Sequence, residues 1–455
     1  MKELPGKLLH DLRDVKGFDE AAFIAAHHQP AVISVRLNPF KPTPVFEHAQ
    51  AVPWCEEGRY LEIRPSFTLD PYFHAGAYYV QEASSMFLAH MFRSLIGDRK
   101  GLRVLDLCAA PGGKSTLLAS VLDRTSLLVS NEVIRSRASI LEENMTRWGY
   151  MNTFVTSNDP KDLAKLPGYF DVMVVDAPCS GSGLFRKDER ALEEWSENNV
   201  QLCAQRQQRI LADAWPALKE DGILIYATCS YSPQEDEEIL DWLASDMGAE
   251  SLKVDLPVEW GVVSTHSEKA GFAGYRFSPD KVKGEGFFIA AVRKKAETDE
   301  MKQAKFKTAH DKKVFQQALY LLSGEEYTCL KTGDGYSVIL PEHEAEIHLI
   351  QQALYLRKTG IAIGQAGAKE WLPAHEISLS IERNSNLPTI EVNKEQALLF
   401  LKKEDFNIPN YDKGWYLISY NGLGLGWVKA LGNRFNNYLP KHWRIRMDIS
   451  SADWA

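Results

Sequence analysis

The chain has 455 residues, 45% hydrophobic and 25% charged, with a formal net charge of −9. These values are ordinary for a globular protein of about two to four domains and exclude a disordered or low-complexity chain. No apolar run is long enough to span a bilayer and the first residues do not resemble a secretory signal, so we expect a cytoplasmic protein. The acidic total excludes a uniformly basic nucleic-acid binder but not a local basic face.

Six cysteines in so long a chain do not form the dense pattern of a disulfide framework. No Cys-x-x-Cys pair or histidine cluster suggests a metal site, so no metal is expected. The thiols are therefore expected to be reduced and available for chemistry.

Residues 1–75 are expected to form an N-terminal α+β module. Their pattern predicts an amphipathic helix over 18–28 and a strand over 31–40 that stops at proline. Arg36, Asn38 and Lys41 place cationic and polar groups at the end of that strand. From these residues, the module is either a nucleic-acid-binding unit or a packing extension.

Residues 76–295 alternate strand and helix patterns in the manner of a doubly wound α/β sheet. The unit that organises this region is a short apolar strand over 103–107, a Pro-Gly-Gly turn and a helical pattern with leucines at core spacing. Further strands are expected over 126–131, 152–156, 170–175 and 222–227, helices over 136–148, 192–218 and from 235, and a late hairpin of 275–277 with 287–292.

The turn over 108–114, Cys-Ala-Ala-Pro-Gly-Gly-Lys, lets the backbone approach a ligand above the strand. It is not a phosphate loop, because Cys108 occupies the position of the first glycine, and G-x-G-x-x-G is also absent. Asp106 lies on the strand, and Glu132 follows the next strand, where an acid can accept hydrogen bonds from a ribose. The pattern favours a nucleoside without a pyrophosphate, and S-adenosylmethionine fits that description.

Two neighbouring strands end in loops that each carry a cysteine, Cys179 and Cys229. Carbon 5 of a pyrimidine is too weak a nucleophile to take a methyl group directly, and a thiolate that adds to carbon 6 activates it. An acidic residue such as Asp176, at the same edge, suits the protonation of ring nitrogen 3. From the residues alone, either cysteine could be the nucleophile.

Three motifs, over 106–114, 176–183 and 227–230, together resemble the Nol1/Nop2/Sun family of RNA cytosine-5 methyltransferases. The match covers about 76–292 and implies a Rossmann-like, S-adenosylmethionine-dependent core. It implies that Cys229 is the nucleophile and that Cys179 assists release of the product. DNA cytosine methyltransferases attack from their Pro-Cys loop, so Cys179 is the alternative nucleophile.

The resemblance also implies roles for the remaining site residues. Lys114 would contact the target base and Asp176 the base or the methionine end of the cofactor, so the implied catalytic residues are Cys229, Cys179, Asp176 and Lys114. Glu132 would bind the ribose and Asp159 the adenine. The implied cofactor residues are Cys108, Ala109, Ala110, Pro111, Gly112, Gly113, Lys114, Glu132, Arg137, Asp159 and Asp176.

The remainder of the chain is expected to hold a linker, a middle domain and a C-terminal domain. Residues 296–313 are charge-dense and predict the linker. The middle domain, 314–382, should contain a helix over 347–356 and loop-rich structure over 360–373. The C-terminal domain, 383–455, should contain two strands, 414–420 and 425–429, around an Asn-Gly turn.

Between 411 and 446 six cations face a single acid and alternate with aromatic residues, which suits either an RNA-binding surface or a solvated face. The cations are Lys413, Lys429, Arg434, Lys441, Arg444 and Arg446, and the aromatics include Trp415, Trp427, Phe435, Tyr438 and Trp443.

The extension after residue 300 resembles the bacterial branch of the RsmF type, which modifies 16S ribosomal RNA. This resemblance implies a PUA-like C-terminal domain, and 16S rRNA or the small ribosomal subunit as the partner. The strand over 35–38 is similar to the family's N-terminal RNA-binding module. The oligomeric state is left open, with a monomer expected.

Two other functions stay as alternatives. An amino-group methyltransferase would carry Asn/Asp-Pro-Pro-Tyr/Phe where this chain has Asp-Ala-Pro-Cys over 176–179. A non-catalytic RNA-binding assembly factor would keep the fold and the cofactor pocket, but it would have no chemical need for two thiols at the ends of strands.

Overall fold

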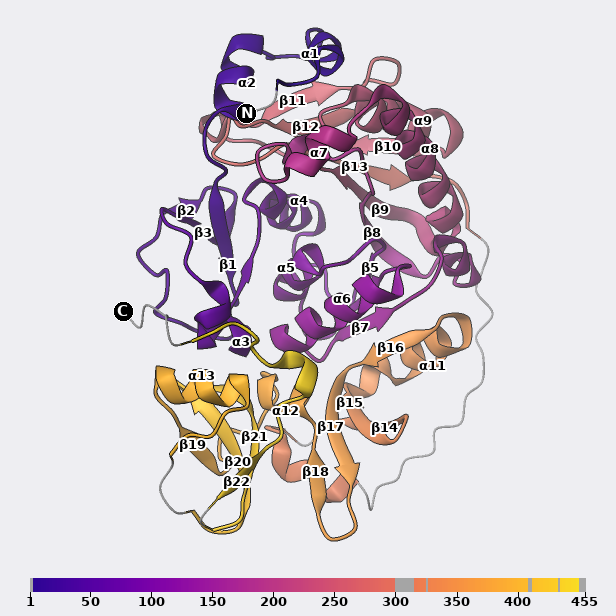
Figure 1. Cartoon of the computed structure of the whole chain (residues 1–455). Coiled ribbons are helices and arrows are strands. Elements are labelled where there is room, and N and C mark those ends of the chain that lie inside the picture. The colour runs from indigo at the N-terminus through magenta and orange to yellow at the C-terminus, as the bar shows by residue number, and fades with distance from the viewer. Residues whose placement is uncertain (1–2, 299–314, 325, 408–410, 433, 450–455) are drawn as a thin grey trace.

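The computed structural model describes residues 3–298, 315–324, 326–407, 411–432 and 434–449. The described residues form one ten-stranded sheet and three four-stranded sheets. In Figure 1 the N-terminal module lies at the top and left of the catalytic region, and the two C-terminal domains lie below it. Most of the predicted linker, 296–313, lies outside the described residues. No helix within the described ranges is long and apolar enough to cross a membrane.

The N-terminal module contains the predicted helix and strand, α2 (Glu20–His27) and β1 (Ile33–Leu37). The Asp19 side chain caps α2 by accepting a hydrogen bond from the Ala22 amide at 3.0 Å. The sheet has the order β2-β3-β1-β4, so it continues past residue 75 into β4. The other elements are α1 (Gly6–Leu12), β2 (Ala51–Val52), β3 (Cys55–Leu61), α3 (Pro71–Ala75) and β4 (Tyr78–Val80).

Arg36, Asn38 and Lys41 are buried, and they hold this module against the catalytic domain. The Arg36 guanidinium donates to Thr116 Oγ1 at 2.6 Å and stacks over the Trp148 ring at 4.6 Å. Asn38 Nδ2 and Lys41 Nζ donate to main-chain carbonyls at the end of α6 (Arg135–Trp148), at 3.1 and 2.7 Å. These three residues therefore serve packing, while RNA binding by the module stays a prediction.

The ten-stranded sheet has the order β11-β12-β13-β9-β8-β5-β6-β7-β16, and β10 pairs with β13. Strands β5 to β9 run parallel, as the doubly wound pattern predicts, and β12 and β13 form the predicted hairpin. Their bounds are β5 (Arg103–Asp106), β6 (Leu127–Asn131), β7 (Thr153–Thr156), β8 (Phe170–Asp176), β9 (Leu218–Thr228), β10 (Ala249–Leu252), β11 (Val263–His266), β12 (Ala273–Phe277) and β13 (Phe287–Lys294).

Alternate residues of the strands divide the core into two layers. Val104 and Val174 lie in the cluster that contains α4, α5 and α6, whereas Leu105 and Val175 lie in the cluster that contains α8 and α9. The helices therefore cover both faces, which confirms the Rossmann-like α/β fold. Besides α6, they are α4 (Phe87–Ile96), α5 (Gly113–Val121), α8 (Glu197–Ala214) and α9 (Glu237–Asp246).

The single helix predicted over 192–218 is wrong. The chain forms α7 (Glu189–Glu194), leaves the helix at Trp195 and starts α8 after Ser196, whose hydroxyl accepts a hydrogen bond from the Asn199 amide at 3.2 Å. Pro216 then lies in a 3-10 turn, and Leu218 already begins β9. A serine N-cap and a proline are ordinary helix boundaries, and they outweigh the continuous apolar pattern.

The middle domain is joined to the catalytic sheet, because β16 (Leu356–Thr359) pairs antiparallel with β7. The predicted helix is α11 (Glu344–Ala353). The loop-rich structure expected over 360–373 is wrong, since two paired strands occupy it, β17 and β18. The other bounds are β14 (Thr328–Thr332), β15 (Gly335–Ile339), β17 (Ile361–Ala366), β18 (Trp371–Pro373) and α12 (His375–Leu379).

The C-terminal domain contains the predicted hairpin, β20 with β21. Asn421 and Gly422 both have positive φ, 48° and 79°, as a tight hairpin turn requires. Trp427 is buried and donates to the Ala374 carbonyl at 2.8 Å, so the expectation that it lies on a stacking surface is wrong. The bounds are β19 (Thr389–Glu391), α13 (Lys394–Lys402), β20 (Gly414–Tyr420), β21 (Leu423–Ala430) and β22 (Phe435–Asn437).

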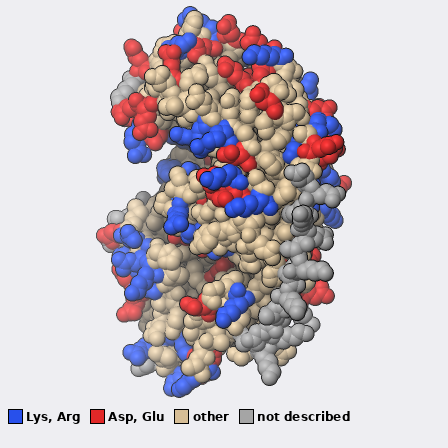
Figure 2. Space-filling view, turned by 90° about the vertical axis from the view of Figure 1, so that its right-hand side faces the viewer, with Lys and Arg blue, Asp and Glu red and all other residues tan. Residues whose placement is uncertain are grey.

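Of the six predicted cations, Lys429 is paired with Glu370 of the middle domain. The other five are exposed: Lys413, Arg434, Lys441, Arg444 and Arg446. Figure 2 shows basic and acidic side chains mixed over one face of the molecule, with Lys and Arg beside a recess between its upper and lower parts. The net charge of −9 is therefore compatible with local basic areas.

Candidate active site

The predicted site loops meet at the carboxyl ends of the parallel strands. Asp106 ends β5, Asp176 ends β8 and Thr228 ends β9. Asp106 is in register with Val174, and Asp176 with Ala227, so these strands stop at the same edge of the sheet. The glycine turn and both cysteine loops follow directly from this edge, where open α/β sheets bind ligands.

The two loop cysteines are in contact. Sγ of Cys179 lies 3.0 Å from Sγ of Cys229, and both residues are partly exposed. The hydrogen bond to Cys229, together with burial, raises the pKa of Cys179 well above its ordinary value. Cys179 therefore keeps its proton.

Lys114 and Asp176 form an ion pair at the same edge. Lys114 Nζ lies 2.7 Å from Asp176 Oδ2 and 5.2 Å from the centre of the Phe287 ring. Burial lowers the pKa of Lys114, but attraction to Asp176 and the hydrogen bond between them outweigh it, so the pKa is raised. Lys114 is thus an ammonium group, and it lies beside the Asp176 side chain.

Asp106 has an unused acceptor inside the site. Its Oδ2 accepts a hydrogen bond from Ser115 Oγ at 2.6 Å, but Oδ1 is buried and has no hydrogen-bond partner among the described residues. Burial raises the pKa of Asp106 to about 7. An orphaned carboxylate oxygen in this place fits a cationic donor such as the amino group of S-adenosylmethionine.

The glycine turn is held rigidly around this position. Gly112 has a φ of 115°, and a Cβ there would lie 3.3 Å from Leu141 Cδ1, so a larger residue would be strained. Asn144 Nδ2 donates to the Pro111 carbonyl at 2.8 Å, and Arg137 Nη2 to the Ala110 carbonyl at 2.7 Å. In the structure Arg137, an expected cofactor contact, thus binds the turn that would face the cofactor.

The other expected cofactor residues lie near the same edge. Glu132 is buried just after β6, with Oε1 accepting from the Ile134 amide at 2.9 Å and Oε2 3.7 Å from Arg137 Nη1. Asp159 follows β7 and caps a 3-10 turn by accepting from the Lys161 amide. Burial raises the pKa of Cys108, which therefore lines the turn as a neutral thiol.

Asn131 is a site residue that sequence reasoning missed. Its Nδ2 donates to the carbonyls of Leu107 and Asn158 at 3.2 and 3.0 Å, and its Oδ1 accepts from Thr156 Oγ1 at 2.9 Å. One amide thereby joins the ends of β5, β6 and β7. No motif marks this residue, which the pattern treats only as the last position of a strand.

No group of His, Cys, Asp or Glu side chains in the described ranges could hold a metal ion. None of the six cysteines, all of which lie in the described ranges, forms a disulfide. The chemistry available at this edge is therefore that of two adjoining thiols, a Lys–Asp pair and a carboxylate ready to bind a donor.

Comparison with known proteins places this chain in a family. A family model described as 16S rRNA methyltransferase RsmB/F matches residues 95–293. Models of the N-terminal domain of 16S rRNA methyltransferase RsmF and of the methyltransferase RsmF PUA domain match residues 4–83 and 387–445. Together these matches cover the three regions that carry the resemblance seen in the sequence.

Two curated relatives, each called ribosomal RNA small subunit methyltransferase F, match nearly the whole chain. The protein of Psychromonas ingrahamii is 32% identical, with 92% of each chain covered, and that of Shewanella loihica is 31% identical, with 95% and 92% covered. The similarity thus extends through the middle domain.

Two solved structures from Pyrococcus horikoshii share the fold. A methyltransferase homologue is 27% identical, with a TM-score of 0.51 over 64% of this chain and 100% of that chain. NSun6, solved with SFG, is 19% identical, with a TM-score of 0.53 over 64% and 99%. The chain therefore belongs to the RsmF branch of the Nol1/Nop2/Sun family, the S-adenosylmethionine-dependent methyltransferases of bacterial 16S ribosomal RNA.

Proposed function

We propose that this chain methylates carbon 5 of cytosine in 16S ribosomal RNA through a covalent adduct of Cys229, and that Cys179 assists release of the product. The observation that carries the proposal is the 3.0 Å separation of the two thiols, beside the Lys114–Asp176 pair. Methyl transfer to nitrogen or oxygen needs a positioned base but no thiol, whereas carbon 5 needs covalent activation. Two thiols at one edge are therefore best accounted for by cytosine-C5 chemistry.

The first step is addition of the Cys229 thiolate to carbon 6. A bond forms between Sγ and carbon 6, and the electron pair of the C5=C6 bond shifts to C4=C5. The electron pair of the C4=N3 bond moves onto nitrogen 3, which takes up a proton. Asp176 passes this proton from the ammonium group of Lys114, with which it is paired at 2.7 Å. Cys179, whose pKa is raised by its hydrogen bond to Cys229 and by burial, stays protonated and stabilises the neighbouring thiolate.

Bound S-adenosylmethionine supplies the methyl group that the activated carbon 5 takes. Asp106 and Glu132 would hold the amino group and the ribose of this cofactor, Asp159 the adenine, and the turn over 108–114 its methionine part. Carbon 5 then loses its proton, the C5=C6 bond re-forms and the bond from carbon 6 to sulfur breaks. Cys179 gives its proton to the departing sulfur and is restored by the proton from carbon 5. The C4=N3 bond re-forms when carbon 5 takes the methyl group, and nitrogen 3 then returns its proton through Asp176 to Lys114.

The test compares the wild type with Cys229→Ala and Cys179→Ala, using 16S rRNA or small subunits and radiolabelled S-adenosylmethionine. We expect labelled 5-methylcytosine only from the wild type, because each variant lacks one step. On denaturing gels Cys179→Ala should accumulate protein covalently bound to RNA, because addition proceeds without release. Cys229→Ala should form neither adduct nor product.

Cys203→Ala is the control, since Cys203 is a free cysteine on α8, outside the two loops. It should methylate RNA like the wild type. Trapping by Cys229→Ala instead of Cys179→Ala would reverse the roles of the two cysteines. Label on a base other than cytosine would refute the proposed reaction.

A further inference from the structure

The two cysteine loops are tied to one buried carboxylate, that of Glu235. Glu235 Oε1 accepts a hydrogen bond from the Ser180 amide at 2.8 Å, and Oε2 accepts from the hydroxyls of Ser180 and Ser230 at 2.5 and 2.6 Å. Ser180 directly follows Cys179, and Ser230 directly follows Cys229. One side chain therefore contacts the neighbours of both reactive thiols.

Glu235 is not held by a cation, unlike the acids that follow it. Asp236 and Glu237 both pair with Arg276, whereas no Lys or Arg in the described part of the chain forms an ion pair with Glu235. Glu235 is fully buried, and burial raises its pKa. Because a buried carboxylate is costly, it persists only where hydrogen bonds replace its lost hydration, and here those bonds come from the cysteine loops.

Gln207 completes the arrangement from α8. Its Nε2 donates to Glu235 Oε1 at 3.2 Å and to the Pro178 carbonyl at 3.1 Å. A main-chain hydrogen bond from Gly183 to the Cys229 carbonyl, at 2.9 Å, aligns the two loops further along. The Tyr231 amide also donates to Ser182 Oγ at 2.8 Å, so the loops contact each other directly, and the Glu235 carboxylate adds a bond to the residue that follows each thiol.

We propose that Glu235 is a positioning residue that fixes the separation of Cys179 and Cys229 by binding Ser180 and Ser230 together. This inference rests on the proposed function for its catalytic consequence. Addition to carbon 6 forms its bond with Cys229 and needs Cys179 only as a hydrogen-bond partner of the thiolate, whereas release needs a proton transfer between the two sulfurs at their fixed separation. Loss of Glu235 should therefore impair release more than addition.

The first experiment measures the separation of the thiols without RNA. Diamide takes two electrons and two protons from a pair of thiols and leaves a disulfide, which mass spectrometry of non-reduced peptides locates. We expect the wild type and Glu238→Gln to form the Cys179–Cys229 disulfide at similar rates. Glu238 is an exposed residue on α9, so it controls for the same substitution nearby. Glu235→Gln should form the disulfide about tenfold more slowly. The NH2 group of the glutamine would face N–H and O–H groups that are themselves donors, so hydrogen bonds to the cysteine loops would be lost.

The direction of the change in oxidation rate distinguishes a loss of thiol positioning from a loss of the Glu235 charge. Besides the hydrogen bond to Cys229 and burial, the charge of Glu235 raises the pKa of Cys179. Removal of the charge alone would make thiolate more abundant and would speed the oxidation. A slower reaction therefore reports a lost position, and a rate equal to or above that of the wild type would overturn the proposal.

The second experiment removes one arm at a time and measures trapped adduct and product with RNA. Ser180→Ala loosens the Cys179 side, so adduct should accumulate as release slows. Ser230→Ala loosens the Cys229 side, so adduct formation should itself slow. Either change combined with Glu235→Gln should add little, because the three residues act as one unit.

These serine variants keep the test valid if Glu235→Gln fails to fold, because each deletes a single hydroxyl. Wild-type partition between adduct and product in both of them would overturn the proposal. The two proposals can fail separately. If Glu235→Gln forms the disulfide more slowly but the wild type never labels cytosine, the proposed function is refuted and the positioning role stands.

Discussion

At the scale of single residues, the sheet edge contains charged groups that only a ligand would complete. Asp106 is the clearest case, because one carboxylate oxygen is bound by Ser115 and the other is buried without a partner among the described residues. Such a group destabilises the empty protein and becomes useful when a cation arrives. The effect of the buried Asp106 carboxylate on stability and its contribution to cofactor binding can be measured separately.

Burial raises the pKa of Asp106 from 3.8 to about 7. Between these values the folded protein holds a proton that the unfolded chain has released, so this group makes the free energy of unfolding fall as pH rises from about 4 to 7. We expect Asp106→Asn, which keeps the acceptor for Ser115, to melt higher than the wild type at pH 8 and to lose that part of the pH dependence. Its affinity for S-adenosylmethionine should fall by about tenfold or more.

Thermal melts over this pH range and titration calorimetry measure the two effects. Asp98→Asn is the control, because Asp98 is exposed and should change neither quantity. Parallel melting curves for the wild type and Asp106→Asn would contradict the proposed burial cost. Unchanged cofactor affinity would exclude Asp106 from the binding site.

The sequence predicted site residues where a motif names them and missed those that act through distant partners. Cys179, Cys229 and Asp176 were placed at strand ends by their loops, and the structure brings them to one edge. Glu235 looked like the start of a helix, since its partner Ser180 lies 55 positions away. No local pattern contains such a contact.

At the scale of elements, the N-terminal module is fixed to the helix that follows the glycine turn. Arg36 on β1 donates to Thr116 Oγ1 and to the Gly113 carbonyl of α5, at 2.6 and 3.3 Å. No acidic side chain in the described ranges pairs with it, and burial lowers its pKa to about 10, still high enough to keep it charged. The Arg36 guanidinium therefore finds its hydrogen-bond acceptors at Gly113 and Thr116, the part of the molecule that it holds in place.

Arg36→Ala should lower the free energy of unfolding by about 2 kcal/mol or more, because it leaves buried acceptors unpaired. Affinity for S-adenosylmethionine should fall as well, since Gly113 belongs to the turn that we propose to bind the cofactor. Arg36→Lys should not restore either property, because an ammonium group cannot reach the same set of acceptors. Denaturant unfolding and calorimetry measure both, with Arg64→Ala, an exposed arginine of the same module, as the control. Full rescue by lysine would contradict this account.

Elements were predictable from the sequence where one local pattern decides them. The parallel strands and the Asn-Gly hairpin follow from short apolar runs and turn residues. The break between α7 and α8 was missed because a capping serine, Ser196, was weighed below a long apolar pattern. Strands β17 and β18 were missed because their pairing, and not their composition, makes them strands.

At the scale of the whole molecule, the C-terminal domains are not separate attachments. β16 extends the catalytic sheet through β7, and Asn421 Nδ2 of the C-terminal hairpin donates to the Tyr72 hydroxyl at 2.6 Å. These pairings join residues about 200 and 349 positions apart, which no sequence pattern shows. Deletion of 383–455 would therefore disturb the N-terminal module as well as RNA binding. Surface substitutions test RNA binding more directly.

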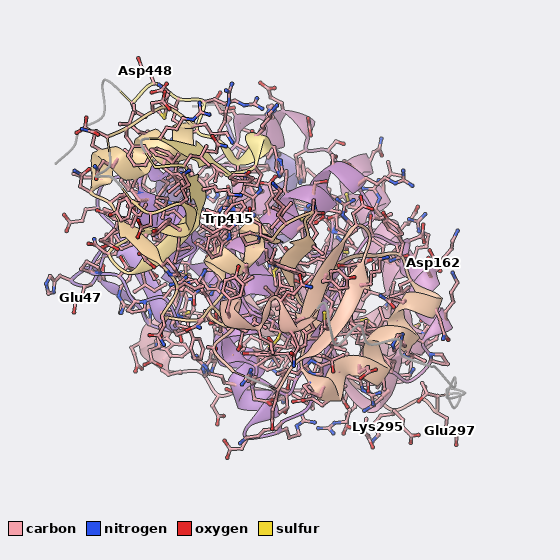
Figure 3. All side chains as sticks on the ribbon, turned by 90° about the horizontal axis from the view of Figure 1, so that it is seen from below. Glu47, Asp162, Lys295, Glu297, Trp415 and Asp448 are labelled. Carbon is pink, nitrogen blue, oxygen red and sulfur yellow. The ribbon has the colours of Figure 1, made fainter. Side chains whose placement is uncertain are left out.

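Lys441, Arg444 and Arg446 form an exposed basic group near the end of the described chain. Figure 3 shows their neighbour Asp448 on the opposite side of the molecule from Lys295, which supplies a distant control. If the group contacts RNA phosphates, replacing all three by alanine should weaken binding and reduce the slope of log K against log salt concentration by up to about 2. Lys295→Ala should change neither quantity. Filter binding to 16S rRNA over a range of salt concentrations measures both quantities. An unchanged slope in the triple variant would place the RNA path elsewhere, because binding with fewer phosphate contacts must release fewer counterions.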